Sequence, residues 1–354
     1  MYKKFFMGIA AMAALTLVSC SSDDLNSLSD NSSKNEAISF DGYLGRSAVA
    51  VNGSRGSVLD KDALQKLTDG GFGVFGNYNS TEDQKFGANL FNNQSVTYSS
   101  TESKWTYSPL KYWPTQGHID FLAYAPYDSK YADKVSNENQ KLDFAVNSDI
   151  KNQIDLLWAN AKGQTKQTIS STDNKVKFQF AHALSRLGYT VKLKDAYSDA
   201  TITLKNITLA GSIDGTKPAF YKEGTIDLSK EDKAAKLWTP STTADKQKFV
   251  WFSSDQKLAT TDYNNPNTDY LFVIPQDFSQ KTTGADELYV IVEYTIQTGT
   301  TALMTSKVYQ KIDKNFEQGK AYKINLTIGL TPIEFNAEVT KWDESDKGYD
   351  ITWE

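Results

Sequence analysis

The sequence predicts an all-β protein with antiparallel sheets. Apolar and polar residues alternate with period two at many places along the chain, which is typical of strands with one buried face. Aromatic residues make up 12% of the 354 residues, and these side chains favour strands. Signals for helices are scarce. The length corresponds to about two domains of roughly 150 residues each.

Residues 1–19 predict an export signal. A positively charged start precedes an apolar run over 5–18, which is too short to span a bilayer. The run ends at Cys20 in a stretch that resembles the lipobox of bacterial lipoproteins, and Cys20 is the only cysteine of the chain. An ordinary signal followed by an unrelated cysteine is the alternative. Residues 20–36 are rich in serine, asparagine and aspartate, which predicts a flexible tether.

The first expected strand covers residues 38–44, and a stretch near the other end of the chain is similar to it. The alternating positions of the first strand are Ile38, Phe40, Gly42 and Leu44. Those of the second stretch are Ile333, Phe335, Ala337 and Val339. Both run isoleucine, phenylalanine, small residue, aliphatic residue, so one strand could take the slot of the other in the same register. Chance likeness between two strands of a β protein is the alternative.

Arg46 and Arg55 follow the first strand in a segment of small residues, where proteolytic nicking concentrates. The chain has only three arginines, against 35 lysines. We expect an arginine-specific protease to cut after Arg46, or alternatively after Arg55. The cut separates the first strand and its tether from the rest of the protein. Two solvated loop arginines without a role are the other interpretation.

Removal of the first strand leaves unpaired backbone groups and an apolar groove. A strand from another copy can fill such a groove by adding to the sheet. A head-to-tail contact of this kind need not close on itself, so it can build a filament. This makes residues 38–44 the candidate displaced strand and residues 333–339 the candidate donor strand.

Local patterns predict the remaining elements. One short helix is expected over 59–67, ended by two glycines. Alternation predicts further strands at 176–180, 189–193, 288–296 and 322–328. A long polar stretch places a domain boundary near Thr172. The expected parts after the tether are therefore a domain at 37–172, a domain at 173–332 and a tail at 333–354.

Composition and motifs point away from catalysis. The net charge of −5 argues against a nucleic-acid partner, and one cysteine excludes disulfide scaffolds and thiolate zinc sites. His118 and His182 are expected to make structural hydrogen bonds at strand ends. Residues 71–76 fit the nucleotide-loop pattern G-x-G-x-x-G, but a helix is expected before them instead of a strand. We expect no enzyme, no metal and no cofactor.

Several stretches together make the sequence similar to the fimbrillin family, the type V pilus subunits of Bacteroides-type bacteria. Besides the lipobox, they are residues 105–109, 111–114, 119–126, 180–187, 273–276, 319–324 and 339–342. The resemblance implies two transthyretin-like antiparallel β-sandwich domains in tandem. It also implies a lipidated precursor, proteolysis after a basic residue behind the first strand, and polymerisation by donor-strand exchange. Arg46 matches the implied cleavage place best.

We therefore expect a fimbrial subunit that serves cell adhesion. It would be an outer-membrane lipoprotein precursor at the cell surface and later part of the fimbrium. The implied partners are other pilus subunits, an arginine-specific protease and the lipoprotein export machinery, whereas its place in the pilus and its surface ligand stay open. The alternative is a monomeric surface lipoprotein that binds glycans through Trp105, Trp113, Trp158, Trp238 and Trp251.

Overall fold

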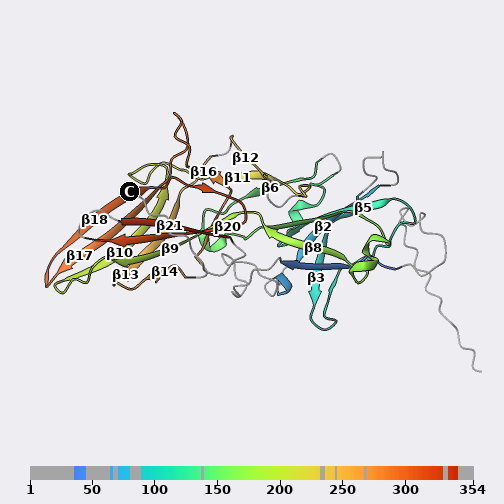
Figure 1. Cartoon of the computed structure of the whole chain (residues 1–354), viewed down its shortest axis with the longest axis horizontal. Helices are drawn as coiled ribbons and strands as arrows, with labels where there is room; N and C mark the ends of the chain where they lie inside the picture. Colours follow the sequence, from blue (N-terminus) through green and yellow to red (C-terminus); the bar gives the residue numbers. More distant parts are fainter. Residues whose placement is uncertain are drawn as a thin grey trace, which may run out of the picture.

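The computed structural model describes residues 36–44, 64–66, 71–79, 89–136, 139–231, 236–243, 245–266, 269–329 and 334–341 (Figure 1). Strands dominate these residues, and the loops between them contain the 3-10 helices η2 (Ser129–Tyr131), η3 (Ile150–Asn152) and η4 (Thr168–Thr172). The prediction of an all-β, sandwich-like protein is confirmed. Within the expected helix over 59–67, the described residues include Leu64 and Gln65, and both are helical.

A seven-stranded sheet forms one half of the molecule, at the right of Figure 1. Its strand order is β1 (Phe40–Leu44), β8 (Val176–His182), β7 (Leu157–Gln164), β5 (His118–Ala125), β2 (Phe72–Asn79), β3 (Asn89–Ser99) and β4 (Lys104–Thr106). β1 lies at an edge and runs parallel to β8, whereas the other neighbours run antiparallel. The sheet curls, so that its edge strands β1 and β4 approach each other.

Both faces of this sheet are buried. Phe72, Phe121 and Phe178 belong to an apolar cluster on the inner face. Leu122, from the opposite face of β5, joins a second cluster that continues into the other half of the molecule. Burial on both faces explains the apolar stretch at 71–76, since β2 is a strand paired on both sides rather than a nucleotide loop.

The other half packs two sheets face to face over the second cluster. One has the order β13 (Phe249–Lys257), β10 (Ala200–Ala210), β17 (Tyr289–Thr298) and β18 (Thr301–Lys311). The other has the order β14 (Tyr263–Asn264), β9 (Ser185–Leu193), β20 (Lys320–Ile328) and β21 (Glu334–Lys341), with β15 (Leu271–Val273) also on β9. Leu204 and Val292 meet Val191 and Ile324 in the cluster between them. The four strands predicted from alternation are confirmed as β8, β9, β17 and β20.

Two small sheets complete the described structure. β6 (Lys141–Ala145) pairs with β11 (Glu223–Asp227), which also pairs with β12 (Trp238–Pro240). β16 (Gln276–Asp277) pairs with β19 (Asn315–Phe316). Because β6 and β11 come from distant parts of the chain, their pairing ties the two halves together.

The expected domain boundary near Thr172 falls before β8. β8 begins at Val176, yet it pairs with β1 and β7 of the first half. A division at Thr172 would therefore remove β8 from its own sheet. We propose instead that the first domain extends through His182, the last residue of β8.

Candidate functional site

The first strand occupies a slot in the seven-stranded sheet. β1 runs parallel to β8, and in the register of this pair Phe40 lies opposite Val176 and Gly42 opposite Phe178. Ile38 and Phe40 are only 1% and 2% exposed. We call the surface that holds residues 37–44 the first-strand slot. It is built by β8, by β3 and β5 behind it, and by residues 107–112.

Aromatic rings surround Phe40 on all the elements that form the slot. The ring centroid of Phe40 lies 5.4 Å from those of Phe91 and Tyr107, 5.5 Å from that of Phe121 and 5.7 Å from that of Phe178. The Phe91 and Phe121 rings meet Phe40 edge to face, the Tyr107 ring is tilted and the Phe178 ring is stacked. Aromatic pairs add about 0.5–1.5 kcal/mol each beyond the burial of area. Phe40 is therefore the main side-chain anchor of the strand.

Backbone atoms at the start of the strand are held from both sides. The Ile38 N–H donates to the Lys111 carbonyl at 2.8 Å, and the Tyr107 hydroxyl donates to the Ile38 carbonyl at 2.8 Å. On the other side, the Val176 N–H donates to the Ser39 carbonyl at 2.8 Å. Burial raises the pKa of Tyr107 to about 12, so the phenol is protonated and donates at neutral pH.

The slot is narrow at Gly42. A Cβ atom at this position would lie 3.0 Å from the Phe72 ring and 3.2 Å from the Phe180 ring. Both rings are buried, and they pack on each other with their centroids 5.3 Å apart. The small residue of the first strand is thus matched to a wall of two rings.

The similar stretch near the end of the chain lies in another sheet (Figure 1). Phe335, Ala337 and Val339 are part of β21, and they occupy register positions opposite Leu326, Ile324 and Tyr322 of β20. β21 runs antiparallel to β20, whereas β1 runs parallel to β8. Within one chain, the structure therefore does not bring the candidate donor strand into the first-strand slot.

The model of the fimbrillin-like family matches residues 66–342. The chain belongs to the fimbrillin-like family. Membership places it among fimbrial and cell-adhesion-like proteins of the cell surface, not among enzymes.

One solved structure from Bacteroides shares this architecture, and the chain is also similar, at lower TM-scores, to others. A fimbrial protein from Bacteroides vulgatus matches with a TM-score of 0.61 and 22% identity, over 87% of this chain and 100% of that chain. A putative cell adhesion protein from Bacteroides ovatus has a TM-score of 0.49 and 15% identity, over 89% and 100%. Another from Bacteroides uniformis has a TM-score of 0.48 and 17% identity, over 86% and 98%. No curated protein sequence matches the chain.

Several predicted site residues of this fimbrillin-like chain lie outside the described residues. These are the lipidation residue Cys20, the cleavage residues Arg46 and Arg55, and the first donor position Ile333. Their roles stay predictions. The described positions of the displaced strand, from Ile38 to Leu44, all lie in the first-strand slot.

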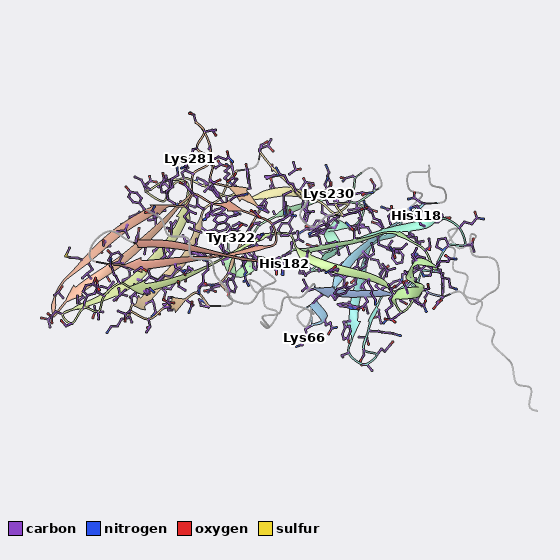
Figure 2. All side chains as sticks on the ribbon, viewed as in Figure 1. Lys66, His118, His182, Lys230, Lys281 and Tyr322 are labelled. Carbon is purple, nitrogen blue, oxygen red and sulfur yellow. The ribbon has the colours of Figure 1, made fainter. Side chains whose placement is uncertain are left out.

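The two histidines make structural contacts at strand ends, as predicted. His182 ends β8 where the two halves meet, and its Nδ1 lies 3.0 Å from a carboxylate oxygen of the buried Asp155 (Figure 2). His118 begins β5, with its Nε2 3.2 Å from the Asn79 amide nitrogen. Among the described residues, no group of three or more histidine, cysteine or acidic side chains is placed to hold a metal. No helix formed by these residues is long and apolar enough to cross a membrane.

No local pattern of the sequence predicts several residues of the slot. Phe91 and Phe121 stand on β3 and β5, and no local pattern shows that they meet Phe40. Tyr107 lies in one of the stretches that carry the family resemblance, yet nothing in that stretch shows its bond to Ile38. These contacts arise only when distant strands come together.

Proposed function

We propose that this chain is a structural subunit of a fimbrium, assembled by exchange of its first strand. The precursor carries acyl chains on Cys20, and two such chains are enough for stable anchoring in a membrane. A protease cut after Arg46, or after Arg55, then frees the first strand from the rest of the protein. The observation that carries the proposal is that β1 is an edge strand which fills an apolar slot.

Emptying the slot is unfavourable. Burial of each large apolar side chain contributes about 1.5–3 kcal/mol, and the slot buries both Ile38 and Phe40. The empty slot also leaves backbone groups of β8 unpaired, which cost free energy unless another strand pairs with them. After the cut, β1 is held without a covalent link to the domain, so a strand with the same pattern can replace it.

Residues 333–339 of a second copy are the proposed replacement. In its own chain the β21 strand pairs with β20, so exchange requires β21 to leave this partner. It then enters the slot of the neighbour parallel to β8, as β1 does. Each subunit donates one strand and accepts one, which makes the contact head-to-tail and the product a filament. The two sandwich domains, which we propose to be transthyretin-like, form its repeating body.

The burial of the tryptophans argues against the alternative of a glycan-binding monomer. Glycan stacking needs an open aromatic face, and the five tryptophans considered for this role are all between 1% and 9% exposed: Trp105, Trp113, Trp158, Trp238 and Trp251. Each of them belongs to one of the two apolar clusters. The tryptophans that suggested a glycan site therefore pack in the core.

Treatment of the purified, unlipidated precursor with an arginine-specific protease tests the proposal. Mass spectrometry locates the new N-terminus, and a denaturing gel reveals detergent-resistant ladders. A cut after Arg46 or Arg55 followed by a ladder supports the proposal. Arg46→Lys and Arg55→Lys are matched variants that keep the charge and identify the cut site. Absence of any cut near the first strand, or a cut without assembly, would contradict it.

A further inference from the structure

The wall at Gly42 restricts what the first-strand slot can hold. A Cβ atom there would lie 3.0 Å from Phe72 and 3.2 Å from Phe180, so a methyl group fits only if a ring moves by a few tenths of an ångström. A branched side chain extends beyond Cβ into the space of these rings. The rings have little freedom to retreat, because Phe72 also packs against Trp105 at 4.8 Å and against Phe178 at 5.8 Å between centroids.

Two residues before the wall, the slot has the opposite character. The Phe40 position is lined by four aromatic rings and accommodates a whole phenyl group. A strand that slips by two residues keeps its buried face, since faces alternate with period two. Such a slip would place the large side chain against Phe72 and Phe180. Alternation alone allows registers that differ by two residues. The wall excludes the register that places a large side chain against its two rings.

The bonds at the start of the slot go only to backbone atoms. Tyr107 donates to the carbonyl of residue 38, and the Lys111 carbonyl accepts from the N–H of the same residue. A strand that slips by two residues can make the same bonds, provided that the new residue is not proline. Selection of the occupant and its register thus depends on the side chains at the positions of Phe40 and Gly42.

We infer that the Gly42 position is a size gate that admits only glycine or alanine and thereby sets the register of the strand in the slot. The gate is a property of the slot itself. Its occupant after exchange, a second copy of this chain, rests on the proposed function. In the copy, Phe335 takes the aromatic position and Ala337 the gate position. Ala337 has the largest side chain that the gate accepts.

Hydrogen exchange on the intact precursor tests the gate without any assembly. Gly42→Val should lower the protection of amides in residues 38–44 by roughly tenfold or more, because overpacking expels the strand. Asp41→Val is the matched control, since it adds the same side chain on the other face. Adding Phe72→Leu to Gly42→Val should restore part of the protection. Equal protection in the Gly42→Val and Asp41→Val variants would overturn the inference.

Polymer formation by the cleaved protein tests the same gate from the donor side. Ala337→Val should reduce ladder formation by about tenfold or more, whereas Ala337→Gly and the opposite-face control Asn336→Val should keep it within about twofold. If Ala337→Val assembles as well as the wild type, the gate is refuted and the proposed function stands. If the wild type forms no ladder, the proposed function fails. The hydrogen-exchange experiment on the precursor still tests the gate in that case.

Discussion

The hydroxyl of Tyr107 donates a hydrogen bond of 2.8 Å to the backbone carbonyl of Ile38, across 69 positions of the chain. The same tyrosine packs its ring on Phe40, two residues further along the first strand. One side chain therefore contacts both the backbone and the main anchor of the strand. Because the hydrogen bond goes to a backbone atom, it would serve a strand from another copy equally well.

Tyr107→Phe should destabilise the precursor by about 1–2 kcal/mol, because the buried carbonyl of Ile38 loses a donor while the ring is kept. Urea unfolding at pH 7 measures this change. Tyr98→Phe is the matched control, since the Tyr98 hydroxyl makes no hydrogen bond among the described residues. Equal stability of Tyr107→Phe and the wild type would show that the bond contributes nothing.

The stability difference between the wild type and Tyr107→Phe should shrink at alkaline pH. Burial raises the pKa of Tyr107 from 10.0 to about 12, so the folded state holds its proton where the unfolded state loses it. The contribution of this group is complete below about pH 10 and is lost as the pH rises toward 12. Unfolding curves of both proteins at pH 8, 10 and 11 measure how the difference in unfolding free energy changes with pH. A difference that stays constant or grows would contradict it.

Phe40→Ala should release the first strand. Truncation of a buried phenylalanine costs about 3–5 kcal/mol, and here it removes the ring that contacts Phe91, Tyr107, Phe121 and Phe178. In the protease-treated protein, the cut fragment should leave faster than in the wild type, as followed by size-exclusion chromatography with mass spectrometry. Asp41→Ala, on the other face of the strand, should leave the release rate nearly unchanged. Equal release rates of the cut fragment in Phe40→Ala and Asp41→Ala would show that Phe40 does not anchor the strand.

Deletion of residues 333–354 should abolish ladders after protease treatment, because the candidate donor strand is lost. The first-strand slot lies in another sheet and should stay intact, so the cut truncated chain can still accept a strand. Mixed with cleaved full-length protein, it should therefore shorten the ladders by capping them. Denaturing gels of a mixing series measure this. Ladders of undiminished length from the truncated chain alone would exclude the tail as donor.

The sequence predicted the strands and their buried faces well. Ile38, Phe40 and Gly42 alternate in the sequence, and all three are buried in the structure. β20 likewise buries the alternating residues that predicted it. Period two is a local property of an extended chain, so a single strand displays it without its partners.

The predicted domain boundary near Thr172 depends on pairing between distant strands, which a local pattern does not show. The polar stretch over residues 160–175, in which the boundary is predicted, resembles a linker when read locally, but it contains the end of β7 and the 3-10 helix η4. The next strand nevertheless returns to the first half and pairs with β1 and β7. Polarity identifies a loop but does not say to which sheet the chain returns.

The sequence by itself determined the all-β class, the buried face of the strands that alternation predicted, the likeness of residues 38–44 and 333–339, and the family. Only the tertiary structure decided that β1 runs parallel to β8, that β21 runs antiparallel to β20, and that Tyr107 and the rings of Phe72 and Phe180 shape the slot. The physical reason is that every residue type except proline offers the same backbone donor and acceptor to a neighbouring strand. Alternation therefore tells which side of a strand is buried, whereas its partner and direction depend on packing between residues far apart in the chain.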